Sequence, residues 1–152
     1  MIATVEINLS NIQKNWLHLN SLSSNKTETG AVLKANAYGL GVSKIAPALW
    51  EVGAKRFFVA TMDEAIELTQ YLPKSVKIYT LNGYHKKYKL AVDKFSIIPV
   101  LNSPAQMISF LDNHPRNKAC LQIDVGMRRL GFQGHEFDQY KHLINSLNLD
   151  LV

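Results

Sequence analysis

The sequence predicts an α/β fold in which parallel strands alternate with helices, and two observations support this prediction. Short apolar runs recur at residues 4–7, 31–33, 57–60, 76–81, 97–101 and 119–123. Most of these runs are nearly continuous, which is typical of strands buried on both faces of a parallel sheet. The segments between them carry apolar residues at helical spacing. Such strand–helix repeats form either an open doubly wound sheet or a closed barrel, and periodicity does not choose between the two.

Each predicted helix has an apolar face, and three segments carry a signal for the start of a helix. The faces consist of Ile12, Trp16 and Leu19; of Val42, Ile45, Ala46 and Leu49; of Ala65, Leu68 and Leu72; and of Phe137, Tyr140, Ile144 and Leu147. Capping-box spacing occurs in the pairs Ser10/Gln13, Thr61/Glu64 and Ser103/Gln106. Pro104 stands where the first turn of a helix tolerates proline.

The chain is predicted to form one structural unit, because no linker or low-complexity stretch interrupts the repeats. Residues 25–30 are expected to be a polar loop, and residues 147–152 to lead from a helix into another strand. A barrel of this type needs eight strands and about 250 residues. If the fold is a barrel, the 152 residues are expected to form only part of it.

The composition is that of a globular domain and argues against several classes of protein. Hydrophobic residues make up 47% of the chain and charged residues 19%. The formal net charge is +5, but only residues 85–89 form a basic run, so no nucleic-acid partner is expected. No apolar run approaches the roughly 20 residues of a membrane span, and residues 1–10 do not resemble a secretion signal. Cys120 is the single cysteine, which excludes an internal disulfide; the cytoplasm is the expected location.

Lys34 is the first candidate for chemistry, because it follows the apolar run at residues 31–33. Ligands of parallel α/β folds bind at the carboxyl ends of the strands. An amine that is partly buried there is more often neutral, and a neutral amine condenses with an aldehyde. Gly39 and Gly41 would let the backbone approach a ligand closely. The residues leave a simpler alternative open, in which Lys34 is a surface lysine and the glycines only form a turn.

Two separated segments resemble alanine racemases. Residues 34–41, Lys-Ala-Asn-Ala-Tyr-Gly-Leu-Gly, are similar to the segment that carries the cofactor lysine in that family, although Leu40 stands where a histidine is common. Residues 124–132, Asp-Val-Gly-Met-Arg-Arg-Leu-Gly-Phe, resemble a second family motif. Weaker similarity at residues 5–9 and 57–65 extends the resemblance over essentially the whole chain.

The resemblance implies a role for four residues. Lys34 would carry pyridoxal 5'-phosphate as a Schiff base and act as the base on one face of the substrate α-carbon. Tyr38 would bind the cofactor phosphate. Arg129 would lie near the cofactor's phenolic oxygen and the substrate carboxylate, for which its fork of donors is suited. The backbone of Met127 would lie near that carboxylate, and no metal ion is expected.

Three further positions near the second motif carry expectations. Asp124 and Gly126 are expected to shape the loop. Gln122 stands where many members of the family have a carbamylated lysine that fixes the neighbouring arginine. A glutamine amide can accept a hydrogen bond from Arg129 without modification, so no carbamate is expected.

The resemblance also implies what the rest of the protein would supply. Residues 1–152 would be the N-terminal portion of a (β/α)8 TIM-type barrel, truncated before the barrel is complete and lacking a C-terminal β domain. The second catalytic tyrosine would come from that domain of the other subunit of a homodimer. The chain alone is therefore expected to have little or no activity as an isomerase that makes D-alanine for the cell wall.

Three alternatives remain open at this point. One is another amino-acid racemase or a decarboxylase of the same fold. A second is a non-catalytic pyridoxal-phosphate-binding protein. The third is an α/β interaction domain that holds no cofactor.

Overall fold

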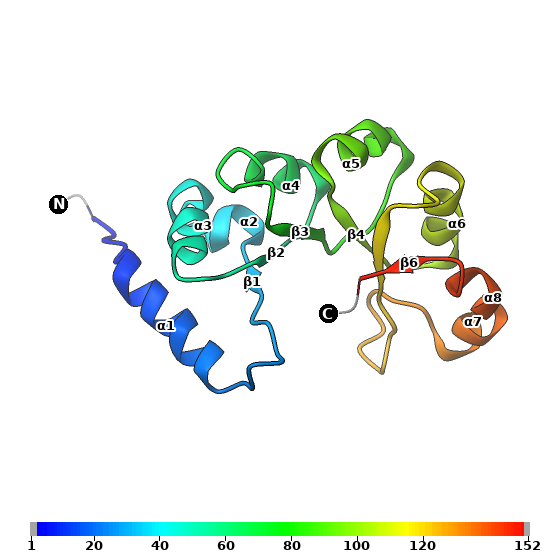
Figure 1. Cartoon of the computed structure of the whole chain (residues 1–152), viewed down its shortest axis with the longest axis horizontal. Helices are drawn as coiled ribbons and strands as arrows, with labels where there is room; N and C mark the ends of the chain where they lie inside the picture. Colours follow the sequence, from blue (N-terminus) through cyan, green and yellow to red (C-terminus); the bar gives the residue numbers. More distant parts are fainter. Residues whose placement is uncertain (1–2, 151–152) are drawn as a thin grey trace.

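A computed structural model describes residues 3–150, and strands and helices alternate along them (Figure 1). In chain order the elements are α1 (Leu9–Ser21), β1 (Ala31–Val32), α2 (Lys34–Tyr38), α3 (Val42–Glu51), β2 (Arg56–Val59), α4 (Met62–Leu68), β3 (Lys77–Thr80), the 3-10 helix η1 (Lys86–Tyr88), α5 (Lys89–Phe95), β4 (Ile98–Leu101), α6 (Pro104–Asn113), β5 (Lys118–Leu121), α7 (Gly134–Gln139), α8 (Lys141–Ile144) and β6 (Asn148–Leu149).

The six strands form one sheet in which every neighbouring pair is parallel and the spatial order follows the chain, β1 to β6. In Figure 1, α3, α4, α5 and α6 follow one another along one side of this sheet. A doubly wound sheet reverses its strand order part-way and carries helices on both faces. Sequential order with helices outside is the arrangement of a (β/α)8 barrel. The observed topology therefore confirms the predicted partial barrel.

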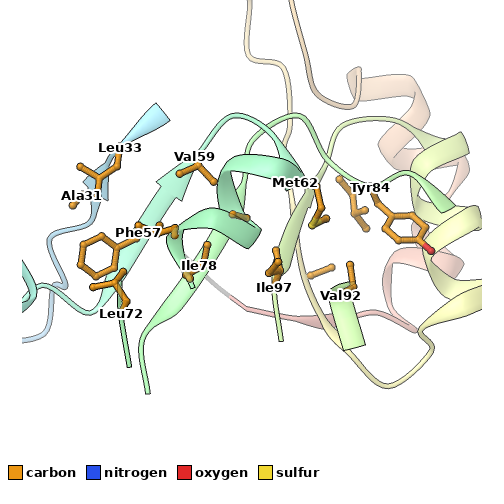
Figure 2. Packing of buried hydrophobic residues seen from close by; sticks show 14 of the residues in the cluster. Ala31, Leu33, Phe57, Val59, Met62, Leu72, Ile78, Tyr84, Val92 and Ile97 are labelled. Carbon is orange, nitrogen blue, oxygen red and sulfur yellow. The ribbon is translucent and has the colours of Figure 1, made fainter. Parts of the chain in front are cut away.

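The core lies on both faces of the sheet. Between sheet and helices, Phe57, Val59 and Ile78 are almost fully buried and pack with Met62 from α4 (Figure 2). On the other face, the buried residues are Tyr79, Ile98, Val100 and Cys120, and Phe58 packs against them. The ring of Phe58 stacks on that of Tyr79, with centroids 4.5 Å apart. Burial on both faces explains why the strands have nearly continuous apolar sequences.

A buried carboxylate joins four strands at the amino-terminal edge of the sheet. Asp150, directly after β6, accepts hydrogen bonds from the Tyr79 hydroxyl at 2.5 Å and from Lys77 Nζ at 2.9 Å. It also pairs with Arg56 Nη1 at 3.1 Å and with Lys118 Nζ at 3.4 Å. Burial alone would raise the pKa of Asp150, but the bonds from Tyr79 and Lys77 outweigh it and hold that pKa well below its ordinary value.

Most of the predicted elements are confirmed, and three details are wrong. The segment predicted as one helix from Phe137 to Leu147 is divided into α7 and α8, and Leu147 lies beyond the end of α8 at Ile144. The strand predicted at residues 4–7 does not form: residues 3–8 adopt neither helix nor strand, and Val5 is 82% exposed. The first helix starts after Asn8 rather than Ser10, because the Asn8 side chain accepts the capping hydrogen bond from Asn11 N. Thr61 and Ser103 cap α4 and α6 as predicted. The predicted last strand is present as β6, although residues 151 and 152 lie outside the described range.

Residues 3–150 lack two features, one typical of membrane proteins and one typical of metal sites. None of their helices combines the length and apolar character needed to cross a bilayer. Within the same range, the side chains of His, Cys, Asp and Glu form no group of three or more suited to a metal ion.

Candidate active site

Lys34 lies at the carboxyl edge of the sheet, as the sequence predicts. β1 ends at Val32, and Leu33 N continues the strand pairing by donating to the Phe58 carbonyl oxygen at 2.8 Å. Leu33 is 4% exposed, whereas Lys34, the next residue, is half-buried. The anchored strand end therefore sets where the lysine stem leaves the core.

The backbone directly after Lys34 forms a left-handed helical turn. Ala35, Asn36, Ala37 and Tyr38 have φ angles of 53°, 54°, 55° and 56°. Residues other than glycine rarely adopt this backbone conformation, because it costs about 1–2 kcal/mol per residue. The four residues together therefore store about 4–8 kcal/mol of strain. Strained backbone of this kind persists only where the surroundings determine it, and it concentrates at functional sites. The sequence did not reveal this turn.

Hydrogen bonds from three directions hold the turn. The Asn36 side chain accepts from Val42 N at 2.7 Å, and the Asn36 carbonyl accepts from Gly41 N at 3.0 Å. Ala37 N donates to the Leu33 carbonyl at 2.9 Å. The third connection comes from Glu64, whose Oε1 accepts from Ala35 N at 2.7 Å. Sequence reasoning identified Glu64 only as a capping residue, because no local pattern shows that its carboxylate reaches Ala35.

Tyr38 and the two glycines give the turn an open face. Tyr38 is 62% exposed, and Lys34 Nζ lies 6.0 Å from the centre of its ring. A Cβ atom added at Gly39 or Gly41 would meet no atom within 4 Å. Their φ angles of 83° and 92°, rather than crowding, explain why glycine stands at both positions. The face beside Lys34 thus offers an amine, a phenol and an uncrowded backbone.

The loop between β5 and α7 carries Arg129 and Met127. Asp124 Oδ1 accepts from Gly126 N at 2.9 Å and from Arg128 N at 3.0 Å, which is the loop-shaping role predicted for Asp124. These backbone donors lower the pKa of Asp124. Arg129 is exposed, and Met127 is 75% exposed. The side chain of Met127 therefore packs little against the rest of the described residues.

Arg129 lines a hollow at the carboxyl ends of β4 and β5. The hollow measures about 310 Å³, and Asn102, Gln106 and Asp124 also line it. Its walls offer amide groups, the Asp124 carboxylate and the guanidinium groups of Arg128 and Arg129. These two guanidinium groups are the strongest partners that the hollow offers to an anionic group of a ligand.

The structure brings Lys34 and Tyr38 together but leaves Arg129 and Met127 on a separate loop. All four lie at the same edge of the sheet, while β2, β3 and β4 stand between β1 and β5. Gln122 Nε2 donates to the Leu130 carbonyl oxygen at 3.2 Å. A hydrogen bond between Gln122 and Arg129, and the lack of a carbamate, stay predictions.

Comparison with known proteins identifies the family. The profile described as "Alanine racemase, N-terminal domain" matches residues 7–152. The chain belongs to this alanine racemase N-terminal domain family. The alanine racemase of Cereibacter sphaeroides is 37% identical over 136 residues, which are 90% of this chain and 39% of that protein. The alanine racemase of Brucella ovis is 43% identical over 117 residues, which are 74% of this chain and 30% of that protein.

Solved structures of the family have the same fold. A crystal structure of alanine racemase from Bartonella henselae, with covalently bound pyridoxal phosphate, superposes with a TM-score of 0.86 at 35% identity and covers 94% of this chain and 43% of that one. Alanine racemase from E. faecalis superposes with a TM-score of 0.84 at 26% identity and covers 94% and 41%. This member of the family thus spans 30% to 43% of the length of these relatives.

Proposed function

We propose that the chain is the N-terminal part of a pyridoxal-phosphate-dependent alanine racemase, an isomerase that interconverts L-alanine and D-alanine. The observation that supports this most is the position of Lys34 at a strand end, next to a strained turn. The chain belongs to a family in which the Bartonella henselae relative holds pyridoxal phosphate covalently.

The residues around Lys34 fit this cofactor. Lys34 would hold the cofactor through Nζ, whose amine could condense with the cofactor aldehyde and release water. The half-buried stem keeps the amine at the carboxyl edge, and the hydroxyl of the exposed Tyr38 could donate a hydrogen bond to the cofactor phosphate. When bound, the cofactor ring system takes up the negative charge that remains after the α-proton of an amino acid is removed.

The same residues divide the work on the substrate. The Lys34 amine would take the α-proton from one face of the substrate. The Arg129 guanidinium would bind the substrate carboxylate and lie near the cofactor, and the Met127 backbone would add a contact to that carboxylate. For this arrangement the loop after β5 must reach across toward β1, which requires the sheet to curl as in a barrel.

The remaining parts of the activity are proposed to lie beyond this chain. Residues 1–152 form the N-terminal portion of the barrel domain, and a C-terminal β domain supplies the second proton donor across a homodimer. We place the enzyme in the cytoplasm, where its D-alanine enters cell-wall precursors. Purified alone, the chain is expected to show no measurable alanine racemisation, and an active fragment would refute this division of labour.

Reductive trapping tests the assignment of Lys34. The chain is incubated with pyridoxal phosphate, treated with borohydride, digested and analysed by mass spectrometry. The adduct is expected on Lys34, and Lys34→Ala is expected to remove at least about nine tenths of it. Lys44→Ala, which alters an exposed lysine on α3, is the matched control and is expected to leave the adduct in place. An adduct that survives Lys34→Ala would contradict the proposed function.

A further inference from the structure

We propose that Glu64 is a positioning residue for Lys34, and this inference depends on the proposed function of Lys34. The Glu64 carboxylate ties the strained turn after Lys34 to the carboxyl end of the neighbouring strand β2. It thereby sets the direction in which the lysine side chain leaves the backbone. Nothing in the helix-capping pattern that contains Glu64 requires this connection.

The contacts of the two carboxylate oxygens carry the argument. Oε2 accepts from Ala60 N at 2.7 Å and from Thr61 N at 3.0 Å, both at the end of β2. Oε1 accepts from Ala35 N at 2.7 Å, 29 positions earlier in the chain. One half-buried side chain therefore binds three backbone N–H groups on two adjacent strand–helix connections.

Helix capping accounts for only part of this arrangement. In the capping box of α4, the Thr61 hydroxyl accepts from Glu64 N at 3.3 Å and Glu64 Oε2 accepts from Thr61 N. These two bonds complete the reciprocal cap. Oε1 is left over, and it is directed at Ala35. The second oxygen therefore serves the turn rather than the helix.

Ala35 is the point at which such a bond has most effect on Lys34. It is the first of the four left-handed residues, and its N–H belongs to the peptide unit that also contains the Lys34 carbonyl. Fixing this peptide plane fixes ψ of Lys34 and hence the orientation of its Cα–Cβ bond relative to the turn. A bond from a charged acceptor is about twice as strong as a neutral one, which suits a contact that opposes backbone strain.

Two substitutions separate positioning from capping. Glu64→Asp keeps the charge and stays close to Ala60 and Thr61, but it is one methylene too short to reach Ala35 as well. Glu64→Gln keeps the length but replaces one acceptor oxygen by an NH2 group, which cannot accept from an N–H. Thr61→Val removes the hydroxyl of the cap and leaves the bond to Ala35. Glu67→Gln alters an exposed carboxylate on the same helix.

The experiment measures pyridoxal phosphate binding at Lys34 in the full chain, by absorbance titration and borohydride trapping, together with unfolding in urea. Glu64→Asp and Glu64→Gln are expected to weaken binding at Lys34 about tenfold, as loss of a hydrogen bond to a charged group implies. Thr61→Val is expected to lower the urea midpoint while leaving the binding constant within about twofold. Glu67→Gln is expected to change neither quantity.

Three results would count against the inference, and they are distinguishable. Unchanged binding in a folded Glu64→Asp variant overturns the positioning role while the proposed function stands. Equal weakening by Thr61→Val and Glu64→Asp assigns the effect to the helix cap and also overturns it. Trapping on a residue other than Lys34 in the unaltered chain refutes the proposed function, and the positioning role with it. If Glu64→Gln fails to fold, Glu64→Asp alone decides.

Discussion

Replacing Asp150 by Asn tests how strongly the carboxylate at the amino-terminal edge of the sheet stabilises the fold. Asn has nearly the same shape, so the change removes charge without leaving a cavity. It takes one acceptor away from the Tyr79 hydroxyl and the Lys77 amine. It also removes one of the two carboxylates that pair with Arg56, the one at 3.1 Å, and leaves the other, Glu28. The Asp150 side chain is only 7% exposed, so water replaces little of what is lost.

The expected loss of unfolding free energy depends on which side chains paired with Asp150 can be hydrated once the charge is removed. Breaking a buried ion pair by removing one partner costs about 3–5 kcal/mol. The side chains of Lys77 and Lys118 are 36% and 50% exposed and can turn to water. The side chain of Arg56 is only 16% exposed, but it keeps its ion pair with Glu28. The cost therefore falls at the lower end, at about 3 kcal/mol. For a chain of this size that corresponds to a fall in Tm of roughly 6–12 °C.

The stabilisation by the Asp150 carboxylate is expected to depend on pH, and the lowered pKa sets the direction of this dependence. Because the pKa of Asp150 is lowered in the folded chain, the carboxylate stabilises the fold above its unfolded pKa of about 4, and this contribution is lost as pH falls further. The difference in unfolding free energy between the unaltered chain and Asp150→Asn should be full at pH 7 and shrink below about pH 4. It is measured by urea unfolding at each pH.

A matched control defines the outcome that refutes this reasoning. Asp138→Asn removes an exposed carboxylate from α7 and is expected to change the unfolding free energy by less than about 0.5 kcal/mol. If Asp150→Asn at pH 7 costs no more than this control, the carboxylate does not hold the four strands together. A difference that does not shrink at low pH would show that shape, not charge, is responsible.

Two further predictions concern single buried positions. Gly83→Ala is expected to destabilise the fold by about 2 kcal/mol in urea unfolding, for two reasons. The φ angle is +82°, and the Gln106 amide, whose Oε1 would lie 1.9 Å from the added Cβ, would have to move away from its hydrogen bonds with Asn102 N and the Asn82 carbonyl. Gly134→Ala, whose Cβ would meet no atom within 4 Å, is its neutral control. Burial and the nearby Asp150 carboxylate raise the pKa of Cys120 to about 11. Iodoacetamide should therefore modify Cys120 at least about a hundredfold faster in urea than in the folded chain, and equal rates would contradict its burial.

Periodicity predicted the sheet and helices because those elements follow from local burial. The continuous apolar runs around Phe57 and Ile78 are explained by cores on both faces of the sheet. The apolar run at residues 4–7 misled the prediction, since Val5 finds no burial among the described residues and remains 82% exposed. Hydrophobicity alone does not show whether a strand has a neighbour to pair with.

Only part of the candidate site was predictable from the sequence, because some of its contacts join residues that lie far apart along the chain. A lysine after a buried strand was sufficient to place Lys34 at the ligand-binding edge. The left-handed turn was not foreseeable from Ala35 or Ala37, because alanine has no preference for positive φ. One of the hydrogen bonds that hold the turn comes from Glu64, 29 positions away from Ala35, which accepts the Ala35 N–H. No spacing rule connects the two residues before the sheet is formed.

The carboxylate under the sheet also has a consequence for biosynthesis. Asp150 meets Arg56 across 94 positions of sequence. At a synthesis rate of about 5–20 residues per second, the ribosome adds the aspartate roughly 5–20 s after the arginine. During that interval the strands already synthesised lack the Asp150 carboxylate, which later connects them at the amino-terminal edge of the sheet. The nascent chain is therefore expected to stay loose at this end, and chaperones that shield exposed apolar surface would act during that time.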